Sequence, residues 1–78
     1  MAAKGFVLIE TAVGRSKEVL VSLNTMEGVK SADQVTGPYD IVAIIEGKDL
    51  NAIGDLVTAK IQSIPDLTRT VTCLVVNP

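Results

Sequence analysis

The chain has 78 residues, of which 47% are hydrophobic and 21% are charged, and its formal net charge is −2 at pH 7. This length predicts one small domain (1–78), and its apolar runs are too short for a membrane-spanning helix. One cysteine, Cys73, and no histidine exclude an intrachain disulfide and any metal site built on histidine. We expect a cytoplasmic protein without metal or cofactor.

Residues 4–13 are rich in β-branched and aromatic side chains, which is typical of a strand buried on both faces. Apolar residues then recur at helical spacing and predict a helix over about 15–26, with Gly14 or Ser16 as its N-cap. Gly28 follows, and glycine suits the left-handed position at which helices often end.

A more polar segment, 29–36, predicts an edge strand. Gly37-Pro38 is the strongest turn signal in the chain, because glycine admits positive φ and proline lacks an N–H group. The strand predicted over 39–46 is apolar on both faces in its middle, as expected of a central strand that is covered on both sides.

Asp49 is placed to cap a helix over about 50–63, which carries apolar residues on one face. Pro65 ends this helix. Residues 67–76 alternate threonine with apolar residues before becoming fully apolar, which predicts the last strand.

The element order is therefore βαββαβ, and its two halves echo each other, since Met26-Glu27-Gly28-Val29 corresponds to Ile64-Pro65-Asp66-Leu67. The fold class predicted is α+β, a ferredoxin-like four-stranded antiparallel sheet with both helices on one face. Three strands are apolar on both faces, so the uncovered face would leave a large apolar surface in water. We expect at least a dimer in which sheet faces sheet.

In element order and motifs the chain resembles the effector-binding (RAM) domain of the Lrp/AsnC transcription regulators. The motifs are Met26-Glu27-Gly28-Val29 leading to Val35-Thr36-Gly37-Pro38-Tyr39-Asp40, then Asp49-Leu50, then Ile64-Pro65-Asp66-Leu67 leading to Thr68-Arg69-Thr70. The resemblance implies dimers that assemble into rings such as octamers, with small effectors, usually amino acids, bound in clefts between dimers. Full-length regulators carry an N-terminal helix-turn-helix for which residues 1–5 leave no room, and this puts direct DNA reading in doubt.

The predicted effector-binding residues are Gly37, Pro38, Tyr39, Asp40, Thr68 and Thr70. Backbone N–H groups of the turn would bind an amino acid's carboxylate, Asp40 would pair with its ammonium, and the threonines would add hydroxyl groups. The resemblance points to the same turn. The alternative stays open that Gly37 only turns the chain, Asp40 caps a local N–H and the threonines are ordinary strand residues.

The remaining candidates for chemistry favour structural roles. Cys73 is expected to be an inert, buried thiol. Glu10 and Glu46 occupy equivalent strand ends, and without a helper residue they do not indicate acid–base catalysis, so no catalytic residues are predicted. The basic residues form no dense patch, and the sheet lacks aromatic residues for stacking, which argues against nucleic acid as a direct partner.

Three classes of function remain. The leading hypothesis is a non-enzymatic module that senses an amino-acid-like effector and modulates transcription through partner regulators, by association with full-length Lrp/AsnC proteins. The second is a small dimeric α+β-barrel enzyme, of the cofactor-free monooxygenase or isomerase type. The third is a regulatory module of a metabolic enzyme, similar to the ACT domains, which share this topology.

Overall fold

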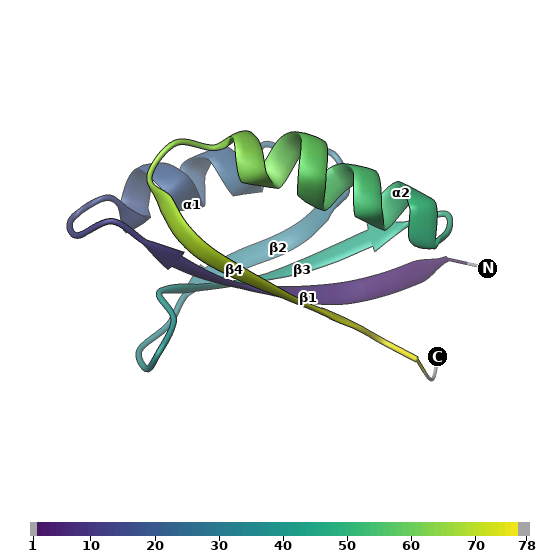
Figure 1. Cartoon of the computed structure of the whole chain (residues 1–78), viewed down its shortest axis with the longest axis horizontal. Helices are drawn as coiled ribbons and strands as arrows, with labels where there is room; N and C mark the ends of the chain where they lie inside the picture. The colour runs from purple at the N-terminus through teal and green to yellow at the C-terminus, as the bar shows by residue number, and fades with distance from the viewer. Residues whose placement is uncertain (1, 77–78) are drawn as a thin grey trace.

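The computed structural model describes residues 2–76. Its elements are β1 (Ala3–Thr11), α1 (Ser16–Asn24), β2 (Val29–Gln34), β3 (Ile41–Gly47), α2 (Leu50–Asp55), η1 (Leu56–Lys60), η2 (Ile61–Ser63) and β4 (Leu67–Leu74). The four strands pair antiparallel in the order β2-β3-β1-β4. Figure 1 shows both helical segments on one face of this sheet. The predicted ferredoxin-like βαββαβ fold is confirmed.

The second helical segment changes type along its length. It begins as the α-helix α2, continues as the π-helical turn η1 and ends as the 3₁₀ turn η2. The predicted cap at Asp49 is confirmed, because the backbone N–H of Ala52 donates to its Oδ1 at 2.8 Å. This bond satisfies one of the N–H groups that lack a partner in the first turn of a helix.

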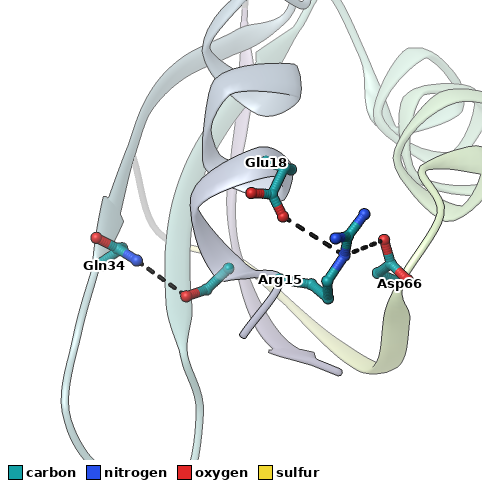
Figure 2. Close-up of polar contacts among 5 residues, drawn as sticks. Arg15, Glu18, Gln34 and Asp66 are labelled. Carbon is teal, nitrogen blue, oxygen red and sulfur yellow. Dashed lines mark hydrogen bonds and ion pairs between the residues drawn. The ribbon is translucent and has the colours of Figure 1, made fainter. Parts of the chain in front are cut away.

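The start of α1 differs from the prediction. Its N-cap is Arg15, without a side-chain cap, rather than Gly14 or Ser16. The hydroxyl of Ser16 instead accepts a hydrogen bond from Gln34 Nε2 at 2.9 Å. Figure 2 shows this contact, which joins α1 to β2.

Arg15 connects α1 to the segment before β4. Its Nε donates to Asp66 Oδ2 at 3.1 Å and lies 3.5 Å from Glu18 Oε2 (Figure 2). The hydrogen bond from Arg15 to Asp66, with the negative charges of Asp66 and Glu18, raises the pKa of the guanidinium. The contact therefore joins two segments 51 residues apart in the sequence.

The internal echo has a structural counterpart. Gly28 and Asp66, which follow the two helical segments, both adopt positive φ, 97° and 74°. Asp66 is the one non-glycine residue with positive φ in residues 2–76. Aspartate tolerates this left-handed conformation better than most residues, which explains why the second half can dispense with glycine.

The core lies between the sheet and the helical segments. Thirteen buried apolar residues form it, and no polar or charged residue in residues 2–76 is buried. Those from the sheet are Val7, Ile9, Ala32, Ile41, Ala43 and Ile45, and those from the helical layer are Val19, Leu23, Ile53, Leu56, Val57, Ile61 and Ile64. Their alternation along β1 and β3 places every second side chain under the helices.

The opposite face of the sheet, called the open face below, carries half-buried apolar residues. They are Phe6 and Leu8 on β1, Val42 and Ile44 on β3, and Val71 on β4. Cys73 lies opposite Phe6 and is exposed, so the prediction of a buried thiol is wrong. Its exposure follows from its place on β4, an edge strand, on a face that the described chain leaves uncovered.

Several element ends fall inside their predicted limits. β1 ends at Thr11 because the chain then turns, with Ala12 donating its N–H to the carbonyl of Asp66 at 2.8 Å, and the side chain of Val13 is fully exposed.

Within residues 2–76 no helix has the length and apolar character needed to span a membrane.

Candidate functional site

The loop between β2 and β3 projects from one end of the sheet, as Figure 1 shows. Its base is closed by a hydrogen bond from the N–H of Val35 to the carbonyl of Asp40, at 2.9 Å. Gly37 and Pro38 are exposed at its tip, and Gly37 has a φ of 134°, in the region that favours glycine. The predicted turn at Gly37-Pro38 therefore lies at the tip of this loop.

Asp40 fastens this loop to the end of β1. Its Oδ2 accepts a hydrogen bond from the N–H of Thr11 at 2.8 Å and lies 3.4 Å from the hydroxyl of Thr11, while its own N–H donates to the carbonyl of Ile9 at 2.9 Å. The bond to Thr11 joins residues 29 apart in sequence, so Asp40 does not cap a local N–H. Within residues 2–76 its second carboxylate oxygen, Oδ1, makes no hydrogen bond.

A β-bulge shapes the start of β4. Glu10 pairs with Arg69 and Thr11 pairs with Leu67, which leaves Thr68 as the extra residue. The hydroxyl of Thr68 lies 3.1 Å from the carbonyl oxygen of Glu10 and 3.0 Å from its Oε1, so it can donate to either. The bulge thus places the Thr68 side chain beside the Glu10 carboxylate.

Arg69 lies against the aromatic ring of Tyr39. Its Cζ is 5.8 Å from the ring centroid, a cation–π geometry that contributes about 0.5–1 kcal/mol at an exposed site. Arg69 forms no ion pair with any residue in the described part of the chain. Its positive charge is therefore available to an anionic ligand.

We call Glu10, Tyr39, Asp40, Thr68 and Arg69 the polar cluster. The structure brings three of the predicted site residues, Tyr39, Asp40 and Thr68, to the end of β1, where this cluster forms. Glu10 and Arg69 were not predicted as site residues. Arg69 stands inside the Thr68-Arg69-Thr70 motif, and pairing the ends of β1 and β4 on paper would have placed it opposite Glu10.

The other three predicted residues, Gly37, Pro38 and Thr70, make none of the contacts that define the polar cluster. Gly37 and Pro38 are at the loop tip and make no hydrogen bond to the threonines within residues 2–76. Thr70 pairs with Ile9, and its hydroxyl lies 3.4 Å from Gln62 Nε2 at the helical layer. A small cavity of about 270 Å³ follows this edge of β4, lined by Gln62, Leu67, Thr68, Arg69 and Thr70.

The polar cluster can bind charge of both signs. It combines an unpaired guanidinium with two carboxylates, of which Asp40 retains one oxygen without a hydrogen bond. Such a set suits a zwitterion, which needs a cation for its carboxylate and an anion for its ammonium. Residues 2–76 contain no cluster of three side chains suited to holding a metal ion.

Comparison with known proteins gives a consistent result. The sequence model of the Lrp/AsnC ligand binding domain family matches residues 4–78. The structure of FFRP-DM1 is similar over 95% of this chain and 99% of its own, with 32% identity and a TM-score of 0.91. TTHA0845 from Thermus thermophilus is similar over 97% of this chain and 95% of its own, with 33% identity and a TM-score of 0.93. No match was found among curated protein sequences.

A longer protein shares the fold. E. coli AsnC is 23% identical and has a TM-score of 0.90, with 97% of this chain covered and 52% of the AsnC chain. The fold described above thus corresponds to about half of that protein.

Proposed function

Because the chain belongs to the Lrp/AsnC ligand binding domain family, we propose that it is a non-enzymatic sensor of an amino-acid-like effector, acting in the cytoplasm. Domains of this family dimerise and bind small effectors. The observation that carries the proposal is the polar cluster, in which an unpaired guanidinium and two carboxylates lie at one end of the sheet.

The effector binds with its carboxylate on Arg69 and its ammonium on the open oxygen of Asp40. Arg69 replaces the turn N–H groups as the main partner for the carboxylate, because a guanidinium can form two parallel hydrogen bonds with it. Gly37, Pro38, Thr68 and Thr70 complete the site, from the same or a neighbouring subunit. The structure of NMB0573 from Neisseria meningitidis, a regulator with a similar fold, is a complex with L-Met, which is a ligand of this class.

Assembly supplies the second part of the function. The open face is the surface that two protomers bury against each other, and dimers then form a ring such as an octamer. Effector occupancy reaches transcription by association with full-length Lrp/AsnC regulators, whose ligand-binding domains offer the same surface. This part is supported by the apolar residues of the open face, which the described chain leaves without cover.

The experiment is a thermal-shift screen of the amino acids, followed by calorimetric titration of the best one. Asp40→Asn is the informative variant, since the amide oxygen can still accept from Thr11 N–H while the negative charge is lost. We expect it to fold and to bind roughly 10-fold to 100-fold more weakly, the loss of a charge-assisted hydrogen bond. Arg69→Gln should weaken binding similarly.

Lys17→Gln is the matched control, because Lys17 is exposed on α1 and forms no ion pair within residues 2–76. It should bind as the wild type does. If Asp40→Asn and Arg69→Gln both retain wild-type affinity, the polar cluster is not the effector site. If no amino acid binds, the proposed function itself is wrong.

A further inference from the structure

Arg69 and Glu10 carry opposite charges and stand directly opposite each other on neighbouring antiparallel strands. Side chains in such positions project to the same face of the sheet, and a pair of opposite charges there is favourable. An ion pair between the two is therefore expected. Yet Arg69 forms no ion pair with Glu10 or with any other residue in residues 2–76. Both side chains must therefore be held by other partners.

The two side chains contact different neighbours. The Arg69 guanidinium lies against the ring of Tyr39, with its Cζ 5.8 Å from the ring centroid. Glu10 Oε1 lies 3.0 Å from the hydroxyl of Thr68, which can donate to it. At exposed positions a cation–π contact and an ion pair contribute similar amounts to stability. Loss of the Tyr39 ring would therefore be enough to shift Arg69 toward Glu10.

The residue after Tyr39 holds it beside Arg69. Asp40 is bonded twice to the end of β1, since its N–H donates to the carbonyl of Ile9 at 2.9 Å and its Oδ2 accepts from the N–H of Thr11 at 2.8 Å. These bonds fix the backbone next to Tyr39, whereas Gly37 at the loop tip is exposed. The ring thus belongs to the anchored end of the loop.

We propose that Tyr39 is a positioning residue, which prevents the Arg69 guanidinium from pairing with Glu10 and so keeps it free for the effector's carboxylate. The proposal rests on the function proposed above, which assigns that carboxylate to Arg69. Without the ring, Arg69 pairs with Glu10, and the effector has to break this pair in order to bind. A binding-competent state that is only partly populated lowers the apparent affinity in proportion to its population. Tyr39 thus acts on affinity through Arg69.

The first test needs no effector. The chain contains two arginines, Arg15 and Arg69, so a ¹⁵N-labelled sample at mildly acidic pH and low temperature should give two Nε–Hε signals. Arg69→Gln identifies the signal of Arg69. Tyr39→Leu should move this signal, because the ring current of the aromatic side chain is lost, and Tyr39→Phe should keep most of its effect. Arg15, which donates to Asp66, is the internal control and should not move.

Glu10→Gln then shows where the Arg69 side chain goes. In the Tyr39→Leu background it should move the Arg69 signal clearly, because the guanidinium loses the carboxylate with which it has paired. In the wild-type background it should move that signal much less. Equal shifts in the two backgrounds, or an Arg69 signal that does not respond to Tyr39→Leu, would overturn the proposal. The backbone amide spectrum reports whether each variant is folded.

The second test measures affinity for glycine, which presents the two charged groups of an amino acid and no side chain. Tyr39→Leu should bind glycine about two- to fivefold more weakly, the size of an exposed cation–π contact, and Tyr39→Phe should lose less. Adding Glu10→Gln should improve affinity more in Tyr39→Leu than in the wild type, because the competing ion pair is removed. If Tyr39 contacted the ligand directly, the two changes would be additive, and that result would refute the positioning role.

The two tests separate failure of this inference from failure of the proposed function. If glycine shifts no amide signal of the polar cluster in the wild type, the proposed function is wrong at this site. The Nε–Hε signals of the effector-free protein then decide by themselves whether Tyr39 keeps Arg69 from Glu10. If glycine binds and the variants show no difference between the two backgrounds, the proposed function stands and the role of Tyr39 is wrong.

Discussion

Gly28 offers a direct test of how the two helical segments pack. Its φ is 97°, and a Cβ built on it would lie 2.9 Å from Leu56 Cδ2, a residue that is only 7% exposed. Gly28→Ala therefore meets two costs, a left-handed backbone and a collision with the core. Gly14 is the matched control, because its φ is 78° and an added Cβ would have no neighbour within 4 Å.

The expected changes in the free energy of unfolding follow from the backbone conformation and the surroundings of Gly14 and Gly28. A left-handed alanine costs about 1–2 kcal/mol, and the reduced freedom of the unfolded chain returns about 0.4–1 kcal/mol. Gly14→Ala should therefore lower the free energy of unfolding by about 0 to 1.6 kcal/mol. Overpacking a core costs about 1–3 kcal/mol, and the colliding Leu56 Cδ2 is the end of a flexible side chain, so Gly28→Ala should be more destabilising than Gly14→Ala by about 1 kcal/mol, the low end of that range.

Urea unfolding at one fixed protomer concentration measures both values, since assembly makes stability depend on concentration. Leu56→Val removes the atom that collides, so the Gly28→Ala/Leu56→Val pair should be less destabilised than the sum of the single variants. Coupling of about 1 kcal/mol or more is expected for residues in contact. Equal losses at Gly28 and Gly14, with additive effects at Leu56, would refute the packing described here.

The remaining predictions concern a cap, a turn and the open face. Asp49→Ala should lower the free energy of unfolding by about 1 kcal/mol, because Ala52 loses its capping partner, whereas Asp49→Ser should recover most of it in the same urea assay. Asp66→Ala should be more destabilising than Asp66→Asn. Both variants lose the charge that faces Arg15, but asparagine tolerates the left-handed conformation better than alanine does. Equal losses of stability would argue against a backbone effect. Ile44→Lys should raise the dimer dissociation constant at least about tenfold, since an unpaired ammonium would be buried in the interface. Val21→Lys, on the exposed side of α1, should leave sedimentation unchanged, and a wild-type dimer in Ile44→Lys would rule out the open face as the interface.

The periodicity of apolar residues was sufficient to predict the order and type of the elements. These residues recur with the period of a strand in β1 and β3 and with the period of a helix in both helical segments. It was not sufficient for their ends. Val13 is apolar and β-branched and was counted with the first strand, yet it lies fully exposed in a turn. The division of the second helical segment into α, π and 3₁₀ turns had no local signal in the sequence.

Prediction of the site residues depended on register. Asp40 and Thr68 are 28 positions apart in the sequence, and both reach the end of β1, where Asp40 accepts from the N–H of Thr11 and the Thr68 hydroxyl lies beside Glu10. The bulge at Thr68 shifts the pairing by one residue, and no pattern in residues 67–76 indicated it. Alternation alone would place Thr68 and Thr70 on the same side, but the bulge interrupts it, and the hydroxyl of Thr70 meets Gln62 while that of Thr68 meets Glu10.

The two edges of the sheet differ in how well they resist misassembly. β2 carries Lys30 and Asp33, and charges on an edge strand discourage the addition of a foreign strand. β4 carries one charge, Arg69, next to its bulge, and from Thr70 onward the chain reads Thr-Val-Thr-Cys-Leu-Val-Val, without charge, proline or glycine. Seven such residues on an exposed edge have the composition of an amyloid nucleus. On prolonged heating, fibrils should therefore grow from residues 70–76, and a single lysine at Thr72, near the middle of that run, would interrupt them.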